Sequence, residues 1–429
     1  MKGGKKGKRW ALLLTVLLVV GLIGSFNLPL FAQQKEISFL MWSSFVPSSN
    51  LELQRQINEW NKKHPDVKAR IDFISYKELV VKLATEAEAG AGHDIVWLRH
   101  MDPTLYAESL IDVDDICQEL DAKYGGFIPA AKQLAFYKGH WKAVPWFYWS
   151  TLFVYRTDYF EQIGETKDKV HKYTWEDLLA AAKKVAALGH PGGFQINTGT
   201  YDANDTLYPI LWSYGAATVN EKGEVVINSP ETIKAIDYVK KLFPAMPRDV
   251  LGWDDASNNR FILSGYGSWT FNSPSIWIAA LNDFPDIARV IDYAPVPSGP
   301  EGQFRCPSSA SLGIWKFSKN KELAKDLVKF LLEKKQFDRQ IVQSNGYNEP
   351  FLRDLKKHPI WTQFATLRAY EPGVEQITLA GWPGPSGPGA NKVYHTFVVP
   401  VMFAKALTGT PDKEAIKWAE DEIKRLYFE

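Results

Sequence analysis

Apolar and polar positions follow two different periods along the chain after residue 33. Apolar residues run through 37–41 and 94–98, and they alternate with charged residues over 67–73, which predicts three strands. Between these strands apolar residues recur at helical spacing, and Ser49 and Ser75 each precede a Glu by three residues, the pattern of a capping box. Because strands alternate with helices, we expect parallel pairing through right-handed crossovers, as in a doubly wound α/β lobe.

The same alternation continues in the second half of the chain. A strand is predicted over 312–317, and no internal repeat is visible. The Gly- and Pro-rich stretch 381–389 suits neither a helix nor a central strand, so it is interpreted as an ordered loop or lid, or as a flexible connector. Helices are predicted over 174–188, from Ser229 onwards, over 320–334, and from Thr410 to near Tyr427.

Residues 1–32 have the three parts of a secretory signal. A cluster of Lys and Arg precedes an apolar run over 10–26, and a cleavage site after Ala32 follows. The alternative is an uncleaved anchor, although the apolar run is short against the roughly 17–25 residues of a spanning helix. No Cys lies near the junction, so lipid attachment there is excluded, and we expect a periplasmic protein.

Length and charge narrow the class of protein. About 400 residues remain after the signal, more than one hydrophobic core usually serves, so two lobes are expected. The remaining chain has 45 basic and 49 acidic residues, because five of the 50 basic residues lie in the signal. This balance shows no excess of basic residues of the kind that binds nucleic acid or an anionic membrane.

The two cysteines, Cys117 and Cys306, have two open interpretations. They can pair in an oxidising compartment, since both fall in the same predicted lobe, or they are two separate buried thiols. Neither has the neighbours of a metal site or of a redox motif, so no metal and no cofactor is predicted.

Aromatic residues gather where a ligand would reach them, because the carboxyl ends of parallel strands form the binding crevice of an open sheet. A ring covers the apolar face of a pyranose while Asp, Asn or Arg bind its hydroxyls, although Arg over a ring also suits an anion. For any single Trp, core packing explains the position equally well, and Asp255 is assigned to a cap or turn. The candidates are Trp42, Ser43, Arg99, His100, Asp102, Trp146, Tyr148, Trp149, Trp253, Asp254, Trp269 and Asn272.

Signatures of catalysis are scarce. The chain has no H-E-x-x-H, no G-x-S-x-G, no Walker loop and no Cys cluster. Carboxylate pairs exist, but no spacing marks them as a general acid and base. We therefore predict a binding protein with no catalytic residues.

Short motifs along nearly the whole mature chain occur in an order typical of one family. They are found at 60–67, 89–96, 139–145, 152–160, 173–178, 228–232, 294–297, 318–324 and 346–350. Together they resemble the extracellular solute-binding proteins of bacterial ABC importers, in the cluster that includes maltose-type sugar-binding members. Arg156 departs from the Asn or Asp that the family often has there. The missing lipobox departs from lipoprotein anchoring and favours a periplasm.

The resemblance implies a two-lobed fold of the type II-like periplasmic-binding-protein kind, in which a hinge joins two doubly wound α/β lobes. It places lobe one at 33–150 and 297–345, and lobe two at 151–296 and 346–429. It also adds Trp382 and Tyr394 to the candidate ligand residues, and it makes Trp269 the favoured position because its Gly-x-Trp context is similar to a cleft aromatic of the family.

The resemblance also implies a mechanism. The protein is expected to capture a carbohydrate, in particular an oligosaccharide, by hinge closure, and to deliver it as a monomer to membrane permease subunits. Alternatives that stay open are the same binding role for a polyol or an anionic solute, an exported carbohydrate-active enzyme, and a receptor that senses ligand without transport.

Overall fold

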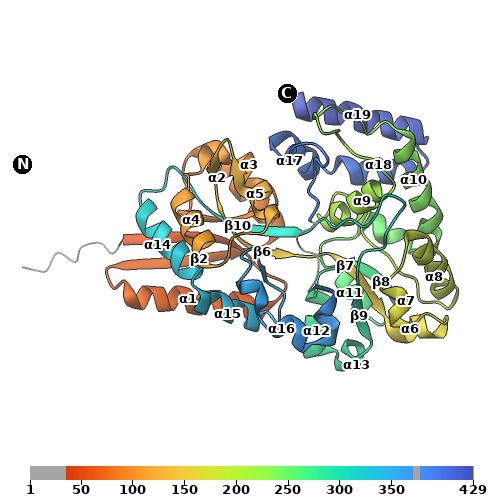
Figure 1. Ribbon diagram of the computed structural model, residues 1–429, viewed down its shortest axis with the longest axis horizontal. Coiled ribbons are helices and arrows are strands. Elements are labelled where there is room, and N and C mark those ends of the chain that lie inside the picture. Colours follow the sequence, from red (N-terminus) through yellow and green to blue (C-terminus); the bar gives the residue numbers. More distant parts are fainter. Residues whose placement is uncertain (1–34, 371–376, 429) are drawn as a thin grey trace, which may run out of the picture.

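The computed structural model describes residues 35–370 and 377–428, so the predicted signal at 1–32 lies outside the described residues. The chain forms two α/β lobes that lie side by side, joined by strands crossing the middle of the molecule (Figure 1). The predicted two-lobed α/β fold is therefore confirmed. Within the described part of the chain, no helix combines the length and the apolar character needed to span a bilayer.

Lobe one is built on a mixed six-stranded sheet in the order β11-β6-β10-β3-β1-β2. β1 is parallel to both of its neighbours, β2 and β3, as the alternation of strands and helices predicted. β10 returns from the other lobe and therefore inserts antiparallel between β3 and β6. The strands are β1 (Lys35–Trp42), β2 (Val67–Ile74), β3 (Ile95–Arg99), β6 (Val144–Trp149), β10 (Ser308–Ile314) and β11 (Glu349–Pro350), with β4 (Phe136–Tyr137) and β5 (His140–Trp141) in a separate hairpin.

A side-chain N-cap is present on one of the described α-helices of lobe one. The capping box of α2 is present: the Ser75 hydroxyl accepts from the Glu78 N–H, and the Glu78 carboxylate accepts from the Ser75 N–H at 3.0 Å. The box expected at Ser49 is wrong, because α1 already begins at Pro47 and the buried Ser49 hydroxyl donates to Gln340 at 3.0 Å. The helices are α1 (Pro47–Lys63), α2 (Tyr76–Ala89), α3 (Asp102–Leu105), α4 (Asp114–Lys123), α5 (Pro129–Ala135), α14 (Lys321–Leu331) and α15 (Lys334–Gln343).

Lobe two has a smaller sheet of three antiparallel strands in the order β8-β7-β9. The parallel, doubly wound arrangement expected for both lobes is not found among the described strands of lobe two, because β8 and β9 both run opposite to the strand that enters from lobe one. The strands are β7 (Leu152–Arg156), β8 (Trp269–Asn272) and β9 (Ile291–Ala294). The helices are α6 (Thr157–Gln162), α7 (Lys167–Val170), α8 (Trp175–Ala187), α9 (Asp202–Ser213), α10 (Pro230–Leu242), α11 (Ser257–Leu263), α12 (Ser275–Asp283), α13 (Pro285–Ala288), α16 (Ile360–Gln363), α17 (Pro388–His395), α18 (Val398–Leu407) and α19 (Asp412–Phe428).

Three segments cross between the lobes. β6 continues through residues 150–151 into β7, residues 295–307 lead from β9 back to β10, and the chain leaves lobe one again after β11. The predicted boundaries at 297 and 346 differ from these crossings. Ser298 exchanges backbone hydrogen bonds with Tyr173 and Trp175 of lobe two, whereas β11 pairs with β6 of lobe one. Backbone hydrogen bonding determines which lobe each segment belongs to, and the order of motifs along the sequence gives no information about that pairing.

Aromatic side chains fill both cores. Trp60 on α1 and Trp175 on α8 are fully buried. The Trp60 indole donates to Asp326 at 2.8 Å, and the Trp175 indole donates to Ser213 at 2.7 Å. Cys117 and Cys306 are separate buried thiols, so the structure has the second of the two arrangements left open for them.

Candidate functional site

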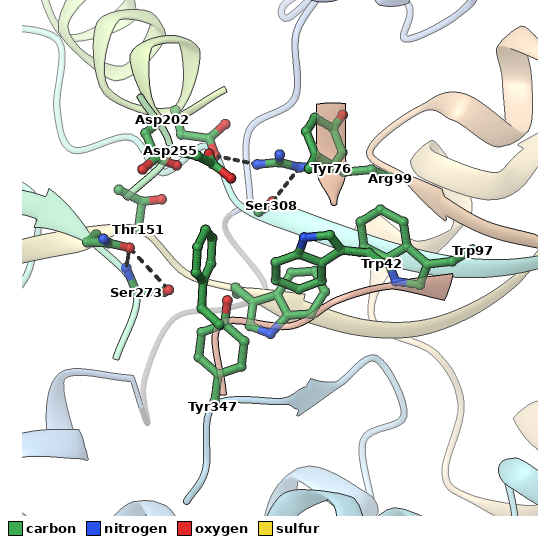
Figure 2. Close-up of a pocket in the computed structure, with 14 residues that line it drawn as sticks. Trp42, Tyr76, Trp97, Arg99, Thr151, Asp202, Asp255, Ser273, Ser308 and Tyr347 are labelled. Carbon is green, nitrogen blue, oxygen red and sulfur yellow. Dashed lines mark hydrogen bonds and ion pairs between the residues drawn. The ribbon is translucent and has the colours of Figure 1, made fainter. Parts of the chain in front are cut away.

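A pocket lies between the two lobes, where the crossing strands meet (Figure 2). Its lobe-one wall comes from the carboxyl ends of β1, β3 and β6, and its lobe-two wall comes from the start of α9 and the loop before α11. Thr151 and Ser308, at the ends of two crossing segments, also line it. A hinge motion would therefore move one wall relative to the other.

The lobe-one wall is aromatic. Trp42 ends β1, and its ring centroid lies 5.5 Å from Trp97 and 5.6 Å from Trp149, which ends β6. Trp149 lies 5.5 Å from Tyr347, with the two rings inclined by 33°. The Trp149 indole N–H donates to Asn348 at 3.1 Å, which fixes the orientation of the ring. These rings offer a rigid apolar surface to a ligand.

Arg99, at the end of β3, connects the two walls. Its guanidinium carbon lies 4.6 Å from the ring centroid of Tyr76 on lobe one and 4.7 Å from that of Tyr201 on lobe two. Its Nε donates to Ser308 at 2.8 Å, and its Nη2 lies 3.8 Å from Asp205 Oδ2. The Arg99 backbone N–H donates to Asp102 at 2.9 Å, so Asp102 holds the end of this strand.

The lobe-two wall is acidic. Asp202 and Asp205 lie on the first turn of α9, and Asp255 lies in the loop before α11. Burial, together with the neighbouring Asp255 and Asp205, raises the pKa of Asp202. Burial also raises the pKa of Asp205 to about 6, although Arg99 opposes this shift by favouring the ionised carboxylate.

Polar side chains complete the pocket. The Asn272 amide donates to Asn259 at 2.7 Å, and its oxygen accepts from the Ser273 N–H at 2.7 Å. With Thr151 and Ser308, these groups present hydroxyls and amides beside the aromatic wall. Rings on one side and carboxylate, guanidinium, amide and hydroxyl groups on the other match the needs of a polar ligand with an apolar face.

Direct contacts join the two lobes next to the pocket. The His100 ring is hydrogen-bonded to the Tyr394 hydroxyl at 3.1 Å, and that hydroxyl donates to Asp205. His395 Nε2 lies 2.7 Å from Asp102 Oδ1. The enclosed pocket has a volume of about 40 Å³, far below the 300–1,000 Å³ of ordinary small-molecule sites. An outer groove of about 1040 Å³, bordered by Phe45 and Thr200, adjoins it.

The structure brings together only part of the residue set expected from the sequence. Trp42, Arg99, Trp149 and Asn272 line the enclosed pocket, and Ser43 and Asp254 border the outer groove. His100, Asp102 and Tyr394 form the contacts between the lobes described above.

The other candidates lie away from the pocket. Trp269 is fully buried in the core of lobe two beside Phe153 and Phe271, and Trp146 and Tyr148 are buried in lobe one. Trp253 packs on Phe261. Trp382 packs on Trp212 and Phe304.

Sequence reasoning missed several lining residues. Asp255, assigned to a turn, lines the pocket, while the exposed Asp254 makes the turn by accepting from Ala256 and Ser257. Asp202 and Asp205 follow no predicted strand, and their i, i+3 spacing at the start of a helix is also typical of ordinary helix starts. Only the folded structure shows that the start of this helix lies at the pocket, facing lobe one.

The fold and the site together define a class of protein: a two-lobed binding protein whose ligand pocket lies at the hinge. Residues 47–336 match the family model described as "Bacterial extracellular solute-binding protein". Because this match covers more than half of the chain, the protein belongs to that family of exported proteins.

Curated relatives agree with this assignment. Over 277 residues the chain is 27% identical to a protein of Deinococcus radiodurans named "Probable ABC transporter-binding protein", and the match spans 62% of each chain. Over 331 residues it is 22% identical to the arabinooligosaccharide-binding protein of Bacillus subtilis, and the match spans 73% of each. The chain thus spans less than two thirds of the first of these relatives.

Solved structures share the fold over nearly its full length. A maltose-bound protein of T. maritima, MalE3, superposes with a TM-score of 0.78 at 26% identity, covering 91% of this chain and 99% of that one. A sugar transporter protein from Arthrobacter chlorophenolicus with bound laminaribiose has the same TM-score, 0.78, and the same coverage at 15% identity, which shows the fold alone.

Proposed function

We propose that this protein captures an oligosaccharide in its interlobe pocket and delivers it to the permease of an ABC importer. The observation that carries the proposal is the wall of rings from Trp42, Trp149 and Tyr347 facing the polar groups of Arg99 and Asn272. Rings cover the C–H faces of a sugar, and the polar groups bind its hydroxyls. The sugar-binding names of relatives in the same family support the same ligand class.

Hinge closure is the proposed mechanism. The enclosed volume of about 40 Å³ does not admit a sugar ring, so the lobes have to separate for entry. The ligand then favours closure because it touches both lobes in the closed form and only one in the open form. No bond of the ligand changes, and the protein acts as a monomer in the periplasm after removal of its signal.

The ligand class is tested by calorimetric titration with a panel of neutral disaccharides and trisaccharides. Phe45 offers a clean variant, because it borders both the pocket and the outer groove and is 39% exposed, so its truncation leaves the core intact. Phe45→Ala should weaken binding by about 1 kcal/mol, or roughly fivefold. Phe284→Ala is the matched control, since this Phe is 44% exposed at the far end of α12.

Two results would contradict the proposal. The first is the absence of binding by every sugar at millimolar concentration. The second is hydrolysis of chromogenic glycosides by the purified protein, which would favour an exported carbohydrate-active enzyme instead.

A further inference from the structure

The lobe-two wall of the pocket carries more carboxyl groups than the pocket has cations to pair with them. Asp202, Asp205 and Asp255 face the pocket together, and among its lining residues Arg99 is the one guanidinium. That cation is already held in place, because the Tyr76 and Tyr201 rings lie 4.6 Å and 4.7 Å from its guanidinium carbon. Ser308 also accepts from its Nε, and its nearest carboxylate is Asp205. Arg99 therefore leaves two of the three carboxylates without a cation.

Asp202 and Asp255 have neutral hydrogen-bond donors instead. Asp202 accepts from Asn258 at 3.1 Å and from Gln195 at 3.5 Å. Asp255 accepts from the Thr200 hydroxyl at 2.5 Å. Neither carboxylate forms an ion pair with any residue in the described part of the chain. Burial raises the pKa of Asp202, and charge repulsion from the neighbouring Asp255 and Asp205 raises it further. A cation between Asp202 and Asp255 would relieve this repulsion.

A second observation points to a ligand with hydroxyls in the same pocket. Trp97 lines it and is 1% exposed, yet its indole N–H has no hydrogen-bond acceptor among the described residues. Figure 2 shows Trp97 beside Trp42, on the side of the pocket opposite Asp202 and Asp255. A buried indole N–H normally finds an acceptor, so a ligand oxygen suits this position.

We infer that the favoured ligand is an amino sugar or an oligosaccharide containing one, whose ammonium group binds between Asp202 and Asp255. This inference rests on the proposed function and narrows its substrate class. The ring of the sugar lies on Trp42 and Trp149, its hydroxyls reach Asn272 and the other polar groups, and its amine supplies the cation that this wall lacks. Ammonium–carboxylate hydrogen bonds are about twice as strong as neutral ones, so the amine decides the preference.

The test compares sugars that differ only at the amine. The purified protein is titrated at about pH 6.5, where a sugar amine is largely protonated, with the free-amine disaccharide of glucosamine, with its N-acetylated form and with cellobiose. Glucosamine and glucose form a second pair that does not depend on linkage. We expect each free amine to bind at least about tenfold more tightly than its neutral counterparts.

Substitutions of the two carboxylates test whether they cause this preference for a free amine. Asp202→Asn and Asp255→Asn should reduce the affinity ratio between free amine and neutral sugar to nearly one. Asp286→Asn removes the same charge from a side chain of lobe two that is 91% exposed, and it should keep the ratio of the wild type. Thermal unfolding checks that all three variants fold.

The possible failures are distinguishable. Equal affinity for amine and neutral sugars overturns the amine preference and leaves the proposed function intact. No binding of any sugar overturns both. Tighter binding of spermidine than of the amino sugars overturns the inference that the ligand is a saccharide. A preference for the free amine that persists in Asp202→Asn and Asp255→Asn overturns the assigned position of the ammonium group.

Discussion

Arg99 should control how readily the lobes close. It belongs to lobe one, yet its guanidinium contacts Tyr201 at 4.7 Å and Asp205 at 3.8 Å on lobe two. Arg99→Met keeps much of the side-chain volume and removes the charge. Both interlobe contacts exist only in the closed form, whereas the contact with Tyr76 lies within lobe one and persists in the open form.

The magnitude follows from those two contacts. A unit charge pair near 4 Å contributes about 4 kcal/mol at an effective dielectric constant of 20, and desolvation of both ions offsets much of this. A partly desolvated cation over an aromatic ring adds about 1 kcal/mol. We therefore expect Arg99→Met to disfavour the closed form by about 2 kcal/mol, which is roughly a 30-fold change in the closure equilibrium.

Small-angle X-ray scattering measures the effect as a larger radius of gyration of the unliganded protein. Arg156→Met is the matched control, because Arg156 lies 4.3 Å from the Tyr159 ring and 2.6 Å from Asp158, all within lobe two. This control should leave the radius unchanged. The reasoning is refuted if both variants expand equally, or if Arg99→Met scatters like the wild type.

The pKa of Asp205 predicts how this effect depends on pH. Since that pKa is about 6 with Arg99 in place, Asp205 is ionised at pH 7.5 and mostly protonated at pH 5. The ion pair is lost as the pH falls through this value, so the difference between the wild type and Arg99→Met should shrink at pH 5. A difference that is equal at both values would assign the effect to the ring contacts alone.

Two further predictions concern stability. Trp269→Ala should lower the free energy of unfolding by about 3–5 kcal/mol, because the ring is fully buried in lobe two, and chemical denaturation measures this loss. If the variant is as stable as the wild type but no longer binds sugar, Trp269 is a ligand residue instead. Glu349→Gln should raise stability at pH 8 by up to about 3 kcal/mol and hardly at pH 4.5. Burial raises the pKa of Glu349 to about 7, so the folded wild type retains a proton that the unfolded chain releases, and it loses stability as the pH rises between these values. Equal unfolding midpoints for Glu349→Gln and wild type at pH 8 would contradict this second expectation.

Local signals were sufficient wherever a few neighbouring residues decide the structure. The capping box at Ser75 and the left-handed Gly90 that ends α2 are both present in the structure. The same signal misled at Ser49, because a contact with Gln340, nearly 300 residues away in the chain, uses its hydroxyl. A capping motif shows which hydrogen bond a side chain can form with its own helix. Packing against a distant helix determines which hydrogen bond it actually forms.

Similar limits apply to the site. Trp42 and Arg99 were accessible to prediction because each follows a predicted strand, and the carboxyl ends of parallel strands meet at one edge. Trp149 was accessible because it lies in a cluster of aromatic residues. Trp269 was favoured for its Gly-x-Trp context, but it begins a strand of the small sheet of lobe two and is fully buried in that core. The alternation of apolar and polar residues marks the buried face of a strand. It does not show whether a side chain on that face lies in the core of a lobe or lines the cleft between the lobes.

The sequence by itself determined the alternation of strands and helices, the two-lobed α/β class, and the membership in an exported solute-binding family. These depend on local periodicity, on chain length and on the order of motifs along the chain. Only the tertiary structure decided which polar groups face the ligand. Asp202, Asp205 and Asp255 meet Arg99 across more than a hundred residues of chain, and that meeting depends on how two separately packed cores are set against each other at a hinge. No local pattern encodes a distance between two cores, so the acidic wall, with its carboxyl groups that form no ion pair, became visible only in the folded protein.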